Sequence, residues 1–254
     1  MELQMSMKDK VAIVAGGARD IGRAISLKLA AVGAKVVVNY HSSKADAEVT
    51  VAAILAAGGT AIAVAGDMTK QADVENLVSK AIAAYGDRID VLVNVVGGMV
   101  ARKTLAEMDQ DFFESIMRLN VSSTFLTAKF VTPYMREGSA IVNLASLAGR
   151  DGGGPGASAY ATSKGAVMSF TRALAKELGP RNIRVNCVCP GMIATTFHDT
   201  FTKDVVRANV AASTPLRREG QAKEVADLVA YLASPAASFV TGASVDINGG
   251  LNFS

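Results

Sequence analysis

The sequence predicts an α/β fold in which helices cover both faces of a single seven-stranded, doubly wound parallel sheet. Short apolar runs alternate along the chain with longer stretches whose apolar residues recur at helical spacing. The runs are rich in β-branched residues and almost uncharged, as expected of parallel strands that are buried on both faces. This alternation of strand and helix implies right-handed crossovers within one sheet.

Seven apolar runs are expected to form the strands of this sheet. In the first half of the chain, one helix is expected between each pair of successive strands. The expected strands span Val11–Ala15, Lys35–Asn39, Ala61–Ala65, Val91–Val95, Ala140–Ala145, Arg184–Val188 and Ser244–Ile247. The helices expected in the first half span Ile21–Val32, Ala45–Ala57 and Val74–Tyr85.

Two further helices and a long connection are expected in the second half. A helix over Val121–Arg136 contains Pro133 near its end and should bend or stop there. A helix over Ser158–Leu178 should stop at Gly179-Pro180. The stretch Met192–Gly220 reads as long and irregular. A connection of this kind at the carboxyl edge of such a sheet is a candidate substrate lid.

Length and composition favour a single domain over residues 1–254. Half of the residues are hydrophobic, which is enough for a substantial core. No linker, charge run or low-complexity stretch divides the chain, and residues 1–8 are expected to form a loose N-terminal extension. The 26 basic and 23 acidic residues leave a formal charge of +3, which is too near neutral to indicate a nucleic-acid-binding protein.

The sequence indicates a cytoplasmic protein without a membrane segment. Residues 1–10 include charged side chains and no apolar run, unlike a signal peptide. The charge-free stretches 49–66 and 228–245 are interrupted by glycine or proline, so neither is a continuous apolar helix of ~20 residues. Cys187 and Cys189 cannot build a disulfide framework, and on a strand they would face the same side as buried reduced thiols.

A glycine-rich turn follows the first strand and opens the next helix. Such a turn lets the backbone approach a pyrophosphate, which the N–H groups of the helix start can bind. An ordinary strand-to-helix turn with spare glycines is the alternative. The position directly after the first strand favours a dinucleotide site of the Rossmann fold. The predicted cofactor-binding residues here are Gly16, Arg19, Asp20, Ile21 and Gly22.

The segment after the second strand bears on the choice of dinucleotide. An NAD site usually places an acid there for the ribose hydroxyls, and this segment has none. Arg19 can meet a 2′-phosphate, so NADP is favoured over NAD. Asp67 is placed to bond the adenine amino group, or alternatively to cap the next helix with Thr69. The other predicted contacts in these two segments are Asn39, Tyr40, His41, Ser42 and Met68.

Four polar side chains from different elements are expected at the carboxyl side of the sheet. Tyr160 and Lys164 lie four residues apart on one helix and share a face. A phenol titrates near ~10, and a neighbouring ammonium should draw that pKa down toward useful acid–base chemistry. A solvated surface pair is the alternative. Ser146 after the fifth strand, and Asn120 at the start of the helix after the fourth, favour the catalytic interpretation.

With these residues in place, the chain resembles the short-chain dehydrogenase/reductase family over about residues 8–252. Within that family it is most similar to the 3-oxoacyl-[acyl-carrier-protein] reductases. The resemblance is carried by Gly16-x5-Gly22, Asp67, Asn94-Val95-Val96-Gly97, Asn120, Ser146, Tyr160-x3-Lys164, Pro190-Gly191 with Thr195, and Asp246-Ile247-Asn248-Gly249-Gly250.

The resemblance implies a role for each polar residue. Tyr160 would protonate the carbonyl oxygen during reduction, or act as the base in the reverse direction, and Ser146 would hold that oxygen. Lys164 would lower the pKa of Tyr160 and bond the nicotinamide ribose, and Asn120 would anchor a water in a proton relay to Lys164. No metal is implied. The implied cofactor contacts of the second half are Asn94, Gly97, Tyr160, Lys164, Pro190, Gly191, Ile193 and Thr195.

Three positions depart from the family pattern. Ala15 stands where threonine is usual, so a turn-bracing hydroxyl is missing. Asp20 stands where the middle glycine is usual. An acid there could cap the helix, but its charge is unfavourable near a pyrophosphate unless it points away. Val95-Val96 replaces the usual Asn-Ala and should alter the packing beneath the cofactor.

The activity that the resemblance implies is NADPH-dependent reduction of a ketone to a secondary alcohol, as in the 3-oxoacyl-[acyl-carrier-protein] reductases of fatty acid biosynthesis. An NAD(P)-dependent dehydrogenase of a sugar, polyol or other secondary alcohol is the alternative. A nucleotide-binding regulator with a dead site is a third hypothesis. It is disfavoured because suitable residues fill all four catalytic positions.

The expected partners are a small-molecule or acyl-thioester substrate and acyl-carrier-protein, with neither nucleic acid nor a membrane. The resemblance implies a homotetramer in which the helices Ser158–Leu178 and Val121–Arg136 of paired subunits pack together. An acidic carrier would require a basic rim near the site, and ordinary solvated side chains are the alternative interpretation of its candidates. These candidates are Lys129, Arg136, Arg172 and Arg181.

Overall fold

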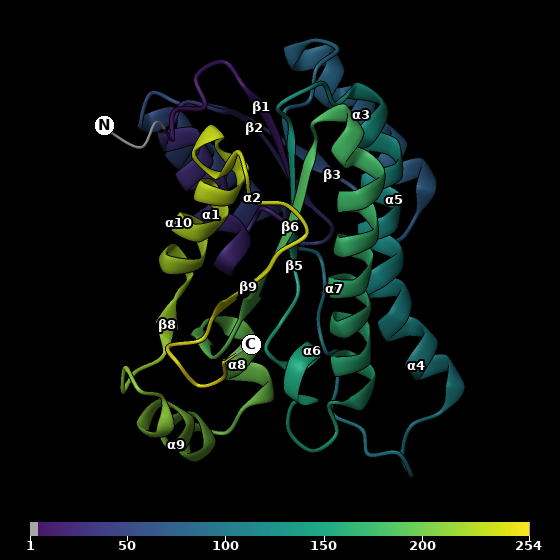
Figure 1. Cartoon of the computed structure of the whole chain (residues 1–254), viewed down its shortest axis with the longest axis vertical. Coiled ribbons are helices and arrows are strands. Elements are labelled where there is room, and N and C mark those ends of the chain that lie inside the picture. The colour runs from purple at the N-terminus through teal and green to yellow at the C-terminus, as the bar shows by residue number, and fades with distance from the viewer. Residues whose placement is uncertain (1–4, 254) are drawn as a thin grey trace.

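The computed structural model describes residues 5–253 and shows a seven-stranded parallel sheet between two layers of helices (Figure 1). The strand order is β3-β2-β1-β4-β5-β6-β9, so the chain starts inside the sheet and winds outward in both directions. The predicted strands are confirmed, with ends that differ by two residues at most. They are β1 (Val11–Ala15), β2 (Lys35–Tyr40), β3 (Thr60–Ala65), β4 (Val91–Asn94), β5 (Ala140–Leu144), β6 (Arg184–Pro190) and β9 (Ser244–Ile247).

The two faces of the sheet build separate hydrophobic cores, because successive side chains of a strand point to opposite sides. In β1, Ala12 and Val14 join one core, whereas Ile13 and Ala15 join the other. The helices that cover the first core are α1 (Asp20–Ala31), α2 (Lys44–Ala56) and α10 (Ala222–Ala233) (Figure 1). Those that cover the second are α3 (Gln71–Tyr85), α5 (Ser123–Val131) and α7 (Ser158–Leu178).

The helix predicted over 121–136 ends as expected but begins much earlier. Helix α4 (Gln110–Met117) runs through a π-helical turn, Arg118–Ser122, directly into α5. Its start was missed although Asp109 marks it, since the Asp109 carboxylate accepts a hydrogen bond from the Phe112 N–H. The chain tightens into a 3₁₀ turn at Pro133. Asn120 therefore lies in the π turn inside a long helix, not at a helix start.

The segment 192–220 is more regular than the sequence predicts. It contains strand β7 (Ile193–Ala194), helix α8 (Thr196–Phe201) and helix α9 (Asp204–Ser213), and β7 pairs with β8 (Gly220–Gln221). Both helices are short, with six and ten residues, which is less than the window of about 11 residues over which helical periodicity is recognised in a sequence. The prediction of an irregular connection was wrong for this reason.

Residues 1–4 of the predicted N-terminal extension lie outside the described residues. Within the rest of it, Met7 is buried and its N–H donates to the carbonyl of Val32. Cys187 and Cys189 are buried free thiols on β6, as expected from their spacing. Across residues 5–253, no helix combines the length and the apolar composition needed to cross a membrane.

Candidate active site

A cavity of about 820 Å³ opens at the carboxyl end of the sheet, between the ends of the strands and helix α8. Its wall includes Gly16 after β1, Tyr40 at the end of β2, Ser146 after β5 and Pro190 at the end of β6. A doubly wound sheet binds ligands at this edge. Of the predicted site residues, only Asn94 and Asn120 do not line the cavity.

The glycine-rich turn is shaped to accept an anion. Gly16 has φ +81°, and a Cβ on Gly22 would lie 1.9 Å from the carbonyl oxygen of Gly16, so no side chain fits at position 22. Because α1 begins at Asp20, the N–H groups of Ile21 and Gly22 have no acceptor within the helix. Both residues line the cavity. The turn therefore fits the pyrophosphate of a dinucleotide.

Asn39 braces this turn from the neighbouring strand. Its buried Oδ1 accepts the N–H of Gly16 at 3.1 Å, and its backbone oxygen accepts the N–H of Gly17 at 2.9 Å. Its Nδ2 donates to the carbonyls of Val64 and Gly66 at 3.3 and 3.1 Å. The bracing that Ala15 cannot provide thus comes from Asn39, through a side chain predicted only as a cofactor contact.

The structure also shows where Val96, a departure from the family pattern, and Asp67, a predicted cofactor contact, lie in the site. The backbone N of Val96 would lie 3.1 Å from a Cβ on Gly16, so Val96 packs directly beneath the glycine-rich turn. Asp67 lines the cavity, and its Oδ1 also accepts from both the N–H and the hydroxyl of Thr69. The alternative role as a helix cap was wrong, because α3 begins only at Gln71 and Lys70 occupies its N-cap position. The position of Asp67 in the cavity wall is compatible with a contact to the adenine amino group.

Lys164 is buried next to Tyr160. Its Nζ donates to the carbonyl of Leu144 at 2.7 Å and lies 5.7 Å from the centroid of the Tyr160 ring. Burial lowers the pKa of Lys164 to about 8, against the opposing influence of the nearby Cys187 and Cys189 thiols. The ammonium form therefore prevails below about pH 8 and is lost above it.

The pKa of Tyr160 differs from the sequence expectation. Burial of the phenol raises its pKa above the ordinary value, and the neighbouring Ser146 hydroxyl offsets part of this rise. The predicted lowering by Lys164 was wrong for this structure, because desolvation dominates. Tyr160 consequently keeps its proton at neutral pH, which suits a proton donor.

Asn120 lies behind the cavity wall, where it holds the segment after β4. Its Oδ1 accepts the N–H of Gly98 at 3.0 Å, and its Nδ2 donates to the carbonyls of Gly98 and Ile116. A Cβ on Gly97 would lie 2.5 Å from this Oδ1 and 3.0 Å from the Nζ of Lys164. Asn120 and Lys164 thus converge on Gly97 from two helices.

Asn94 belongs to a buried polar network that joins strands to helices. Its Nδ2 donates to Asn143 on β5 at 2.9 Å, and its Oδ1 accepts the hydroxyl of Thr127 on α5 at 2.6 Å. Asn143 in turn donates to Thr171 on α7. Asn94 therefore fixes β4 and α7 relative to each other rather than facing the cavity.

Sequence reasoning named none of the α8 residues that line the cavity. They fall within the segment 192–220 that was expected to form a lid, and this side of the cavity is called the lid side below. The ring of Phe197 on α8 lies 5.8 Å from the ring of Tyr160 and 5.0 Å from that of Phe201. Burial lowers the pKa of His198, with a smaller effect of Arg207. A six-residue helix leaves no periodic signal that would identify these side chains. Other lining residues missed are Met99, Arg102, Leu147, Val210 and Leu251.

None of the four candidate basic residues lines this cavity. Tyr160 is near the start of α7 and Arg181 follows its end, so about 30 Å of helix separates them. Arg181 donates to the carbonyls of Thr132 and Met135, and Arg136 pairs with Asp87 at the same distant end.

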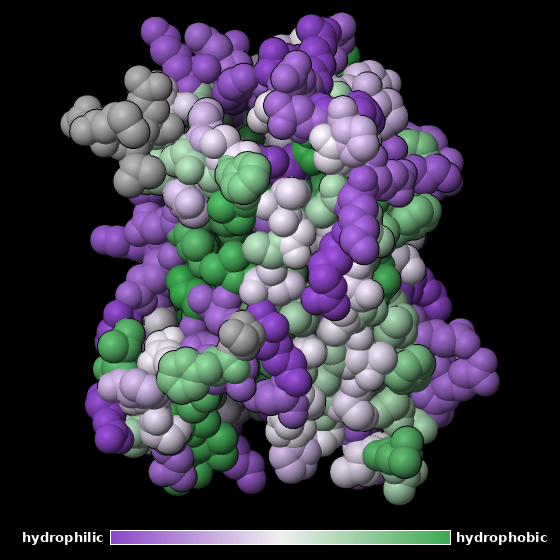
Figure 2. Space-filling model, in the orientation of Figure 1, coloured by the Kyte–Doolittle hydropathy of each residue, from purple (hydrophilic) through white to green (hydrophobic). Residues whose placement is uncertain are grey.

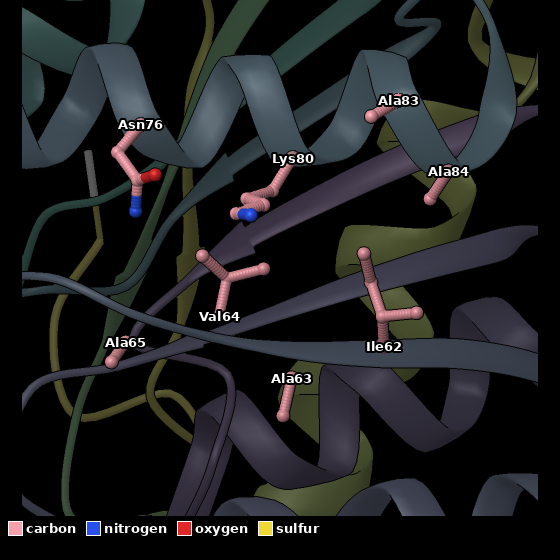
Figure 3. Close-up of a pocket in the computed structure, with 8 residues that line it drawn as sticks. All are labelled: Ile62, Ala63, Val64, Ala65, Asn76, Lys80, Ala83 and Ala84. Atoms are coloured by element: carbon pink, nitrogen blue, oxygen red, sulfur yellow. The ribbon is translucent and has the colours of Figure 1, made fainter.

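A second depression, of about 460 Å³, lies between the outer strand β3 and α3 (Figure 3). Lys80 and Asn76 extend from α3 toward Val64, and the other lining residues are alanine and isoleucine. None of the predicted site residues lies there. The larger cavity is therefore the candidate active site.

Comparison with known proteins identifies the family to which this chain belongs. A family model described as Enoyl-(Acyl carrier protein) reductase matches residues 16–252. A 3-oxoacyl-[acyl-carrier-protein] reductase of Synechocystis is 39% identical over 246 residues, which cover 95% of this chain and 96% of the relative.

Two solved structures share the whole fold. A short-chain dehydrogenase of Burkholderia cenocepacia in complex with NADP has a TM-score of 0.90 at 34% identity, covering 97% of this chain and 99% of that one. A blue fluorescent protein from a metagenomic library in complex with NADPH has a TM-score of 0.90 at 37% identity, covering 98% and 100%. The protein is an oxidoreductase that belongs to the short-chain dehydrogenase/reductase family.

Proposed function

We propose that this protein reduces the ketone of a 3-oxoacyl thioester to a secondary alcohol, with NADPH as the reductant and acyl-carrier-protein as the carrier. The observation that carries the proposal is the buried Lys164 beside a protonated Tyr160, with Ser146 at the same end of the cavity. The similarity to 3-oxoacyl-[acyl-carrier-protein] reductases supports the substrate class.

Ser146, Tyr160 and Lys164 have different roles in the protonation of the carbonyl oxygen. The bound nicotinamide supplies the hydride. Ser146 holds the carbonyl oxygen by a hydrogen bond, and Tyr160 donates its phenolic proton to that oxygen as negative charge develops. The positive charge of Lys164 stabilises the phenolate that remains. Asn120 keeps the Gly97–Gly98 backbone in place beside Lys164.

The preference for NADPH rests on the adenosine end of the cavity. The side chain of Arg19 is 65% exposed and lies in the cavity wall, where its guanidinium suits a 2′-phosphate. No acid lies in the segment 39–43 to bond a ribose 2′-hydroxyl instead. The complexes of two structural relatives with NADP and NADPH support this preference.

The lid side of the cavity favours an acyl chain over a sugar or polyol. Phe197 and Phe201 face it from α8, joined by Met99, Leu147 and Leu251. Hydroxyl groups of a polyol that lie against these side chains would lose their water without gaining partners there, which costs free energy. An apolar chain gains from the same surroundings.

We also propose a cytoplasmic homotetramer. Phe113, Phe125 and Phe170 gather on the outer face of α4, α5 and α7, where Phe125 and Phe170 make an edge-on contact at 6.4 Å. Figure 2 shows the lower half of the surface over α7 as mainly pale to green, whereas hydrophilic residues lie over its upper half. Burial of this face between paired subunits would remove apolar surface from water. Light scattering should give a four-chain mass, and a monomer mass would contradict the proposal.

The decisive experiment follows the NADPH absorbance with three substrate types, as its loss during reduction or its gain during oxidation. Acetoacetyl thioester, on coenzyme A and on acyl-carrier-protein, should be reduced. Crotonyl thioester tests reduction of a carbon–carbon double bond, and a sugar and polyol panel with NADP tests the dehydrogenase alternative. Turnover of either comparison substrate without turnover of acetoacetyl thioester would overturn the proposed substrate class.

A further inference from the structure

The side chain of Asp20 joins two parts of the cavity wall that are 176 residues apart in the sequence. Its Oδ1 accepts the N–H of Thr196 at 3.1 Å, and its Oδ2 accepts the Thr196 hydroxyl at 2.5 Å. Thr196 is the first residue of the lid helix α8, and Asp20 is the first residue of α1. The carboxylate therefore fastens the start of the lid to the glycine-rich turn.

Asp20 holds an unusual backbone conformation. Its φ of +50° lies in the left-handed region, which glycine adopts freely and aspartate adopts at some cost. Its side chain is 26% exposed and does not cap α1, because both oxygens are directed to Thr196. A strained residue whose side chain makes a long-range contact at a cavity is a candidate for a functional role.

The segment that Asp20 fastens carries the aromatic wall beside Tyr160. Phe197 directly follows Thr196, and its ring contacts that of Tyr160. At the other end of α8, the carbonyl of Phe201 accepts from the Nε of Arg102 at 3.0 Å. Helix α8 is thus tied at both ends, and Asp20 fixes the end next to Tyr160.

Asp20 also acts on the cofactor side. Its Oδ2 lies 4.0 Å from the Nε of Arg19, the side chain proposed to meet the 2′-phosphate. Its negative charge lies in the turn that fits a pyrophosphate, where it disfavours a second anion. The same carboxylate therefore stabilises the lid and opposes the cofactor.

We propose that Asp20 is a positioning residue that holds α8 and Phe197 in the place required by the ketone substrate, at the expense of cofactor affinity. Removal of the carboxylate then has two effects of opposite sign. The ketone KM rises because α8 is loosened, and NADPH binds more tightly because a repulsive charge is gone and Arg19 is released. The ketone effect rests on the proposed function, whereas the attachment of the lid and the effect on NADPH do not.

Hydrogen exchange of the purified, cofactor-free protein tests the attachment. Amides of 196–201 should exchange about tenfold faster in Asp20→Ala, since two hydrogen bonds to a carboxylate are lost. Thr196→Val removes the hydroxyl donor alone and should give about a threefold increase. The double variant should match Asp20→Ala, because both changes remove one interaction. Asp46→Ala removes an exposed acid from α2 and serves as the control.

Measurements of NADPH binding and of the ketone KM test whether removal of the Asp20 carboxylate has two effects of opposite sign. In Asp20→Ala the NADPH Kd, measured by nicotinamide fluorescence, should fall about threefold while the ketone KM rises about tenfold. Asp20→Asn retains hydrogen-bonding groups for Thr196 and loses the charge, so it should restore the ketone KM while NADPH still binds more tightly.

Two results would overturn the inference. One is wild-type exchange of α8 in Asp20→Ala. The other is a weakening of NADPH and ketone binding together, which indicates general damage to the site. If the wild type reduces no ketone thioester, the proposed function fails, and the exchange and NADPH measurements still decide the role of Asp20.

Discussion

The two ends of the active-site cavity are built in different ways. At the cofactor end, backbone conformation makes the site: Gly16 holds a φ of +81°, Gly22 has no room for a side chain, and the start of α1 supplies N–H groups. At the lid end, side chains make the site: the ring of Phe197 lies against that of Tyr160, and outside the cavity wall Arg207 pairs with both Asp199 and Glu219. A local backbone motif is visible in a sequence, whereas pairs between distant side chains are not.

The largest expected loss of activity is at Tyr160, where the cofactor end and the lid end of the cavity meet. Tyr160→Phe removes the proton donor and keeps the ring that packs against Phe197, so kcat should fall roughly 1,000-fold. The NADPH Kd should stay near the wild-type value, since the cofactor end is untouched. Steady-state kinetics and fluorescence titration measure both, and unchanged turnover would remove Tyr160 from the mechanism.

Gly22→Ala tests the cofactor end. The new Cβ would lie 1.9 Å from the Gly16 carbonyl oxygen, so the turn must move and its N–H groups lose their alignment. Loss of two hydrogen bonds to an anion should weaken NADPH binding roughly 100-fold. Gly179→Ala is the control, because a Cβ there meets nothing within 4 Å. Thermal melting of both variants separates lost binding from lost folding.

Arg19→Ala tests the cofactor choice at the same end. Loss of a charge-assisted contact to the 2′-phosphate should weaken NADPH binding about tenfold and leave NADH binding unchanged. Arg23→Ala, one turn further along α1, is the control. An equal loss for both dinucleotides would show that Arg19 does not read the 2′-phosphate.

The pH dependence of reduction tests the buried ammonium between the two ends. Lys164 is charged below its pKa of about 8, so the rate should be flat at lower pH and fall above it, by up to about tenfold per unit. The raised pKa of Tyr160 places its own deprotonation at higher pH. In Lys164→Arg the falling limb should disappear from this range. A limb that stays in place would assign the titration to another group.

The smallest expected effect is at the lid end. Arg207→Met breaks both ion pairs of one partly exposed guanidinium, and such pairs contribute little individually. The ketone kcat/KM should fall about threefold with the NADPH Kd unchanged. Lys203→Met on the same segment is the control. An effect on NADPH equal to that on the ketone would show that the two ends are not separable.

The sequence was sufficient for the strands and for most of the cavity wall. Val11–Ala15 is an uninterrupted run of apolar, mostly β-branched residues, and Ser158–Leu178 has apolar residues at helical spacing; the structure confirms both elements. The signals failed where elements are short or irregular. Helices α8 and α9 are shorter than the window over which helical periodicity is recognised, and Asn120 lies in a π turn that no local pattern marks.

The pKa of Tyr160 illustrates a second limit of prediction from the sequence. Spacing on a helix places Lys164 near the phenol, but the direction of the shift depends on how far burial removes each group from water. Burial depends on the packing of Leu144, Ser146 and the lid around α7, which a linear pattern does not contain.

The bracing of the glycine-rich turn by Asn39 has a consequence for cofactor engineering. An acid at the end of β2 is the usual route to NAD preference. At position 39, however, a carboxylate would lose the two N–H donors that meet the carbonyls of Val64 and Gly66, and would place its charge against those oxygens. Redesign toward NAD should therefore begin at Tyr40 or His41, which line the cavity without supporting the turn.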